Sequence, residues 1–337
     1  MPSVGAPMLL GLGKNTADNH FLPLGGVSDV TTVFCNENGY MVTYHSDEHG
    51  FNNQKGIFRN GSVDVALVGD SFTEGACVWP SENLASILTR NGYRTINLGR
   101  QASGPLVELA ITIEYVPVIR PKVLVWMYYE DLAELEEESE QPMLMRYLND
   151  EEFSQDLIHR QEEIDDYLIA EIEKKETQVR ADLDMRYKAT VAASKLFKLY
   201  HLRKAFGLVR LAPKTDFSCP NSTDKRYDRL ISVLKRAKKV VNEWDGTLVF
   251  VNLPGWSRLL NQDREDAQRC TEEYQEFGER LASIGIYYYD ALQFFANANN
   301  NPEAYFALSR PNHYSPVGYR LLGSAIADIL ETDGLME

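Results

Sequence analysis

Long apolar runs are missing from this chain of 337 residues. No segment approaches the roughly 20 consecutive apolar residues that a helix needs to cross a bilayer, so the sequence predicts no transmembrane segment. The first residues, MPSVGAPMLLGLGK, contain a short apolar patch with no basic region ahead of it. A secretory signal peptide needs that basic region, so the start of the chain is a poor candidate for one.

Basic residues are also in short supply, with 34 lysines and arginines against 49 acidic residues and a net charge of −15. Nucleic acids and anionic membranes attract surfaces of the opposite sign, so neither is an expected partner. The apolar share of 44% is that of an ordinary globular protein. A chain of this length forms one large α/β domain or two smaller ones.

Cysteine is scarce, and no two cysteines stand at the close spacing of metal ligands. The four are Cys35, Cys77, Cys219 and Cys270. A zinc site is therefore not expected, and we predict no metal. The thiols are either small core residues or disulfide partners in an oxidising compartment, and the sequence leaves both alternatives open.

Five short, nearly continuous apolar runs are present, each rich in β-branched or aromatic residues. They are Val63–Val68, Arg94–Leu98, Val123–Met127, Thr247–Asn252 and Ile284–Tyr289. This pattern is typical of strands buried on both faces of a parallel sheet.

Helical patterns fall between these runs. Ser81 is a suitable N-cap for a first helix that ends at Asn91-Gly92, Val107–Ile119 predicts a second, and Arg226–Asn242 predicts a third. Alternating strands and helices predict an α/β fold with a doubly wound sheet. In such folds ligands bind at the carboxyl ends of the strands.

Two regions interrupt the alternation. Within residues 25–60, Asn38-Gly39 separates two β-type runs and predicts a hairpin. Residues 132–212 are charged and helical, with an amphipathic stripe made of Leu157, Ile158, Ile164, Leu168 and Ile172. We expect a helical insertion that either packs on the domain or forms a lid over the substrate cleft. Its exit from the carboxyl end of a strand favours the lid.

A candidate nucleophile follows the first of the five predicted strands, in the sequence Gly69-Asp70-Ser71-Phe72. A serine on a tight turn at the end of a strand exposes its hydroxyl and directs backbone N–H groups towards an oxyanion. The motif is not GxSxG, so the lipase-type elbow does not apply.

Four blocks of sequence resemble those of SGNH (GDSL-type) hydrolases, in the family's order and spacing. They are HSDEHGFNNQKGIFRNGSVDVALVGDSFTEGACV, NLGRQASGP, YYEDL and NHYSPVGY. The first is especially similar to bacterial members linked to polysaccharide modification. The resemblance implies a flavodoxin-like three-layer sandwich with strand order 2-1-3-4-5. We assign residues 61–335 to this hydrolase domain and residues 1–60 to an extension.

The resemblance implies that Ser71 is the nucleophile and His313 the base. The family places an aspartate three residues before this histidine, where the chain has Arg310. A guanidinium has donors only, so it cannot accept the imidazole N–H. We therefore expect a Ser–His dyad, or orientation of His313 by a backbone carbonyl or a carboxylate, with Asp290 the first candidate.

The family's oxyanion donors are also altered. Ala102 replaces a glycine that supplies a backbone N–H, and it can do the same if its φ is negative. Gly104, in the same block, is a further candidate for oxyanion or substrate binding, and we expect it to face the substrate. Glu130 stands where the family has an asparagine donor. An ionised carboxylate would repel an oxyanion, so Glu130 could serve in oxyanion binding only if it is protonated. Asn252, at the end of the fourth predicted strand, is a candidate replacement.

We therefore interpret the chain as a serine ester hydrolase that acts on O-acetyl groups of a carbohydrate and needs no cofactor. Alternatives are a carbohydrate O-acetyltransferase, in which a sugar hydroxyl replaces water, and a non-catalytic carbohydrate-binding protein. The expected partner is a small-molecule or carbohydrate ester. The family resemblance favours a periplasmic or secreted location.

Overall fold

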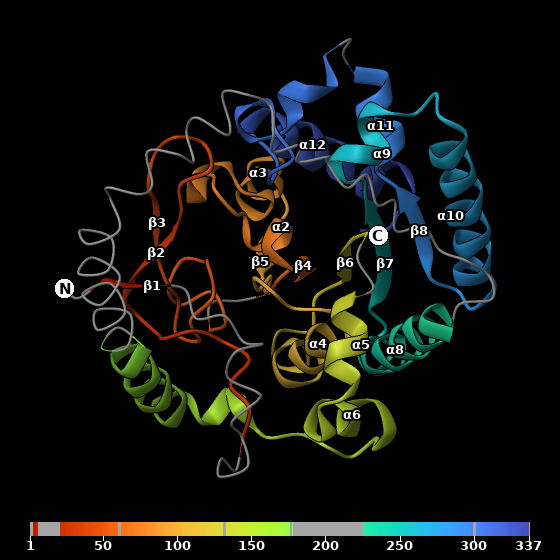
Figure 1. The fold of residues 1–337 in the computed structure, drawn as a ribbon. Helices are drawn as coiled ribbons and strands as arrows, with labels where there is room; N and C mark the ends of the chain where they lie inside the picture. Colours follow the sequence, from red (N-terminus) through yellow and green to blue (C-terminus); the bar gives the residue numbers. More distant parts are fainter. Residues whose placement is uncertain are drawn as a thin grey trace, which may run out of the picture.

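A computed structural model describes residues 3–5, 21–59, 62–130, 133–175, 177, 225–298 and 301–336. Helices cover both faces of a central sheet, and a smaller sheet lies beside it near the N-terminus (Figure 1).

The central sheet contains five parallel strands in the order β5-β4-β6-β7-β8. They are β4 (Val65–Gly69), β5 (Thr95–Asn97), β6 (Val123–Tyr129), β7 (Thr247–Leu253) and β8 (Tyr287–Asp290). Counted along the chain this is the order 2-1-3-4-5, so the predicted fold class and topology are confirmed. Strands β4 and β5 are buried at every residue, which explains their continuous apolar character.

Two separate hydrophobic layers join the helices to the two faces of this sheet. One face carries α3 (Leu84–Arg90), α11 (Leu292–Ala298) and α12 (Pro316–Thr332), and the other carries α4 (Pro105–Ile119) and α8 (Lys225–Val241) (Figure 1). The long helix α10 (Glu265–Ser283) flanks β8. Short elements complete the domain: α2 (Ser71–Glu74), α9 (Trp256–Leu260), η2 (Pro80–Glu82), η4 (Asn242–Trp244), η5 (Pro302–Tyr305) and η6 (Ala307–Ser309).

The predicted cap of the first helix is wrong. Ser81 lies in η2, and Asn83 caps α3 by accepting a hydrogen bond from the Ser86 N–H at 2.9 Å. Both residue types suit an N-cap, so the sequence alone could not choose between two turns two residues apart.

The N-terminal sheet contains β1 (Ser3–Gly5), β2 (Thr31–Cys35) and β3 (Val42–His45). Strands β2 and β3 are antiparallel, which confirms the predicted hairpin. Gly39 turns the chain with φ +85°, a conformation that glycine adopts without a steric penalty. The segment after β3 reaches the main sheet, where Asn53 and Asn97 exchange two hydrogen bonds of 2.8 Å.

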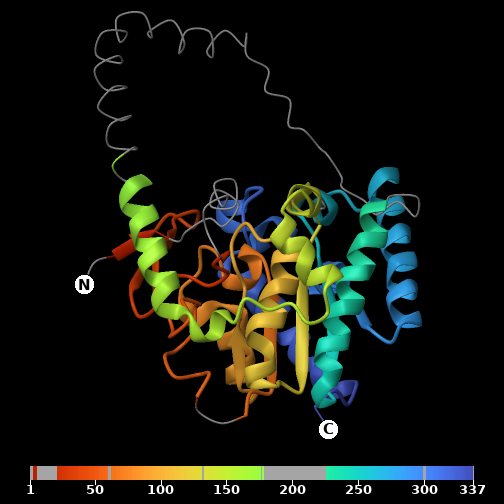
Figure 2. The same ribbon diagram turned by 90° about the horizontal axis from the view of Figure 1, so that it is seen from below.

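The described part of the insertion is largely helical. It contains α5 (Ala133–Ser139), α6 (Pro142–Asn149), η3 (Leu157–His159) and a helix over residues 161–175. The stripe residues Leu157, Ile164 and Leu168 are fully buried. Helices α5 and α6 pack on α4, and the helix over 161–175 lies beside the N-terminal segment (Figure 2). Residues 178–212 of the predicted insertion, and Cys219, lie outside the described residues.

Within the described residues, none of the helices combines the length and the apolar character needed to cross a membrane.

Candidate active site

Ser71 opens α2 just after β4, at the carboxyl end of an interior strand of the sheet. A side chain at Gly69 would collide with the Thr73 hydroxyl and the Met127 carbonyl, so only glycine fits before this turn. Asp70 caps the helix, because its carboxylate accepts the Phe72 N–H at 2.9 Å. Burial raises the pKa of Asp70 to about 6. The N–H of Ser71 lies in the first helical turn, where N–H groups have no partner within the helix.

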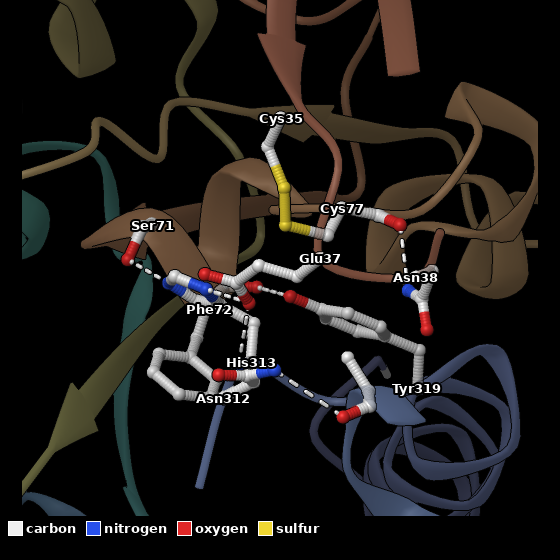
Figure 3. The surroundings of a disulfide bond; sticks show 10 residues. Cys35, Glu37, Asn38, Ser71, Phe72, Cys77, Asn312, His313 and Tyr319 are labelled. Atoms are coloured by element: carbon white, nitrogen blue, oxygen red, sulfur yellow. Dashed lines mark hydrogen bonds and ion pairs between the residues drawn. A yellow bond between two sulfur atoms is a disulfide. The ribbon is translucent and has the colours of Figure 1, made fainter. Parts of the chain in front are cut away.

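Three side chains form a continuous hydrogen-bonded chain next to this turn (Figure 3). The Ser71 Oγ lies 2.8 Å from Nε2 of His313, and Nδ1 of His313 lies 2.9 Å from Oε2 of Glu37. The backbone N–H of His313 also donates to this Glu37 oxygen, at 3.0 Å. The imidazole is therefore held at both ring nitrogens, and its loop is held by the same carboxylate.

The proton positions in this chain follow from the charge of Glu37. The hydrogen bond from His313 holds the pKa of the Glu37 carboxyl below its usual value. An ionised carboxylate accepts only, so Nδ1 of His313 carries the proton and Nε2 is free to accept from the Ser71 hydroxyl. This is the tautomer that a general base needs.

The site is open to solvent without being fully exposed. The side chains of His313 and Glu37 are 25% and 33% exposed. The Phe72 ring packs against the His313 ring with their centroids 4.7 Å apart, and the Tyr319 hydroxyl donates to the Phe72 carbonyl at 2.9 Å. A reactant can thus reach the serine while the imidazole stays fixed in place.

Ser71 follows the first strand of a 2-1-3-4-5 sheet, and His313 lies just before the last helix. This is the arrangement that the sequence resemblance to SGNH hydrolases led us to expect. No model of a protein family matches the sequence, and no curated protein matches it.

Solved structures similar to the chain include a protein assigned to the lipolytic G-D-S-L family from Desulfitobacterium hafniense. That match has 11% identity and a TM-score of 0.43, and it covers 80% of this chain and 100% of the other. A lipase/acylhydrolase from Enterococcus faecalis has 13% identity and a TM-score of 0.43, covering 80% and 95%. A family 3 carbohydrate esterase from Clostridium thermocellum has 11% identity and a TM-score of 0.38, covering 82% and 98%.

The carboxylate that bonds to His313 is not the expected one. Asp290 lies at the end of β8 and pairs with the buried guanidinium of Arg258, so the candidate role of Asp290 is wrong. Arg310 is exposed, and the part of the chain that the structure describes offers it no ionic partner. Glu37 comes instead from the turn between β2 and β3. Neither local spacing nor periodicity marks Glu37, and we find no sequence signal that would have identified it.

Glu130 and Asn252 contact each other rather than the serine turn. The Glu130 carboxylate pairs with Arg258 and accepts from the Asn252 amide and the Gly255 N–H, each at 3.3 Å. Burial raises the pKa of Glu130 to about 7, although Arg258 acts in the opposite direction. Asn252 is completely buried, so its predicted role as a substitute oxyanion donor is wrong.

The two remaining predicted donors differ from each other. The Gly104 N–H donates to the Glu138 carboxylate at 2.7 Å, so the expectation that Gly104 faces the substrate is wrong. Ala102 has φ +55°, so the condition of a negative φ is not met; its backbone N–H is still present, at a steric cost. The N–H groups on either side of Ala102 bond to Glu74 and Arg100. Among the described residues, we find no acceptor for the N–H of Ala102 itself.

Proposed function

We propose that this protein is an SGNH-type serine ester hydrolase with the triad Ser71, His313 and Glu37. The observation that carries the proposal is the unbroken hydrogen-bonded chain from Ser71 Oγ through both ring nitrogens of His313 to Glu37. A nucleophile, a base and an orienting acid in this order are the arrangement that serine triads use for acyl transfer.

The mechanism follows from these contacts. Nε2 of His313 accepts the proton of Ser71 as the Oγ attacks the ester carbonyl, and Glu37 stabilises the imidazolium that forms. His313 then returns the proton to the leaving alcohol, which leaves the acyl group on Ser71. Water activated by the same imidazole completes hydrolysis. The N–H groups of Ser71 and Ala102 are the proposed oxyanion donors.

The proposed substrate is an O-acetylated carbohydrate. Support comes from the first sequence block, which resembles polysaccharide-modifying relatives, and from the partial exposure of His313 and Glu37. With Glu130 in place of an asparagine donor, we expect rates below those of a complete site. Loss of one such donor costs about 3–4 kcal/mol in comparable enzymes.

Hydrolysis of 4-nitrophenyl acetate tests the proposal. Wild type should release 4-nitrophenol, Ser71→Ala should release none above background, and Glu37→Gln should lower kcat by about 10²–10⁴-fold. The exposed variant Asn36→Ala, on the same turn as Glu37, is the matched control. Equal rates for wild type and Ser71→Ala would refute a serine mechanism. Acetate release from acetylated polysaccharides then tests the substrate class.

A second candidate is carbohydrate binding without catalysis. Glu130 favours it, because a carboxylate paired with Arg258 stands where the family has an amide donor. This role predicts that wild type binds glycans while releasing no acetate. An O-acetyltransferase would form the same acyl-serine and pass it to a sugar hydroxyl. Mass spectrometry of an oligosaccharide acceptor would detect the added acetyl group.

We also propose an extracytoplasmic location. The disulfide between Cys35 and Cys77 supports it, because such bonds persist in oxidising compartments and are rare in the cytosol. Cell fractionation with thiol labelling tests this: the two thiols should resist alkylation in the periplasmic or secreted fraction.

A further inference from the structure

Glu37, the proposed acid, is flanked by two residues that are both attached to Cys77, in the loop that follows Ser71. Cys35, two residues before Glu37, forms a disulfide with Cys77 (Figure 3). Asn38, directly after Glu37, donates its side-chain amide to the Cys77 carbonyl at 2.7 Å. Both flanks of Glu37 are therefore fixed to Cys77.

Cys77 is itself connected to the nucleophile. It lies six residues after Ser71 and is completely buried. The N–H groups of Gly75 and Ala76 both donate to the Ser71 carbonyl, at 3.2 and 2.9 Å. The loop from Ser71 to Cys77 is thus closed by its own hydrogen bonds. The disulfide fixes the turn that carries Glu37 relative to this loop.

The rest of the hairpin has its own contacts with the domain. The Tyr44 hydroxyl on β3 donates to the buried Glu74 carboxylate at 2.9 Å, and Asn52 donates to the Glu74 carbonyl at 2.9 Å. These bonds do not involve the cysteines. Breaking the disulfide should therefore release the turn around Glu37 while the body of the hairpin stays docked.

We propose that the Cys35–Cys77 disulfide, assisted by Asn38, positions Glu37 against His313 and thereby sets the activity of the site. This inference rests on the proposed esterase function. The cysteines and Asn38 are positioning residues, because they act through Glu37 and do not touch the serine or the imidazole.

The proposal makes the activity dependent on the redox state of the Cys35–Cys77 disulfide, which a dithiol can reduce. A dithiol supplies two electrons and two protons, the S–S bond breaks to give the Cys35 and Cys77 thiols, and the dithiol becomes a disulfide. Glu37 then loses one of its two flanking attachments. Misplacement of a catalytic group by about 1 Å can cost roughly 100-fold in rate.

The experiment is a double-mutant cycle with 4-nitrophenyl acetate. Cys35→Ser/Cys77→Ser should lower kcat by about 10–100-fold with KM changed less than about twofold. Adding Glu37→Gln to this variant should give the same kcat as Glu37→Gln alone. Asn38→Ala should show a smaller loss, and Asn36→Ala none. The inference would be overturned if the kcat losses of Glu37→Gln and Cys35→Ser/Cys77→Ser multiplied when combined. A wild-type kcat in Cys35→Ser/Cys77→Ser would also overturn it.

Two further measurements keep the result independent of folding and of esterase activity. Dithiol reduction of folded wild type should reproduce the loss, while the Cys35→Ser/Cys77→Ser protein treated in the same way should not change. Proton NMR of the His313 Nδ1–H should show a downfield signal in wild type that is absent from Glu37→Gln and from the serine pair. A signal that persists in Cys35→Ser/Cys77→Ser contradicts the positioning role. A wild-type protein that shows the signal but hydrolyses no ester contradicts only the esterase function.

Discussion

At the residue scale, Ala102 combines a proposed role as an oxyanion donor with an unfavourable backbone conformation. Its φ of +55° lies in the left-handed region, where a Cβ costs roughly 1–2 kcal/mol. The hydrogen bond from Gln101 N–H to Glu74, of 2.7 Å, fixes the loop just before it. The loop that carries this proposed oxyanion donor is therefore held in place at a cost in stability.

Replacing Ala102 with glycine should relieve this cost. Glycine also gains freedom in the unfolded chain, so we expect a net increase of up to about 1 kcal/mol in the free energy of unfolding. The matched control Ala110→Gly, in the interior of α4, should lose about 1 kcal/mol. Denaturant titration measures both, and a loss of stability in Ala102→Gly would contradict strain at this position.

At the element scale, the N-terminus of α4 depends on a carboxylate from the insertion. Glu138 of α5 accepts the Gly104 N–H at 2.7 Å and the Leu106 N–H at 2.8 Å. A Cβ at Gly104 would lie 2.8 Å from the Glu138 carboxylate, so this close approach needs glycine. Burial raises the pKa of Glu138 to about 7, against the opposing effect of these N–H donors. The insertion thus supplies a cap that the helix sequence itself lacks.

Stability should depend on pH through Glu138. A raised pKa means that the folded state holds the proton more tightly than the unfolded chain. This contribution is complete below about pH 4.5 and is lost as the pH rises to about 7. Between these values, wild type should lose roughly 3 kcal/mol relative to Glu138→Gln.

The measurement is the free energy of unfolding at several pH values. Glu162→Gln, at an exposed position, controls for the change in net charge. Parallel curves for wild type and Glu138→Gln would show that Glu138 does not titrate in this range.

At the scale of the whole molecule, the N-terminal segment is part of the hydrophobic core. Leu22, Leu24 and Phe51 are buried in the layer that also contains α4 and α8. The same segment supplies Glu37 to the site. Folding of the segment and assembly of the triad are therefore coupled through one core.

Leu24→Ala tests this coupling. Leu24 is completely buried, so its truncation should lower the free energy of unfolding by about 2–5 kcal/mol in a single cooperative transition. Met41→Ala, in the same region but 53% exposed, should have little effect. A separate early transition in Leu24→Ala would show that the N-terminal segment unfolds independently of the main sheet.

The sequence by itself determined the strands and singled out Ser71 and His313, while the order of the strands in the sheet was implied by the family resemblance. The strands and the two residues are marked by local sequence patterns. A run such as Val123–Tyr129 is apolar because both of its faces are covered, and Ser71 follows a strand through a turn that only Gly69 permits. His313 stands in the NHYSPVGY block, and the resemblance of this block to the family implies that His313 lies beside Ser71. Such features lie within a few residues of one another, so they can be recognised without coordinates.

The tertiary structure decided which carboxylate completes the site. Glu37 and His313 are 276 residues apart, and Arg310 had removed the local acid from the family's pattern. Asp290 ends β8 at the carboxyl edge of the sheet, where Ser71 also lies. It pairs instead with Arg258, because the buried charge of Arg258 requires a neutralising partner. The turn between β2 and β3, which the Cys35–Cys77 disulfide joins to the main domain, brings Glu37 to Nδ1 of His313. No local pattern encodes this contact, because it depends on how the N-terminal hairpin docks on the folded sheet.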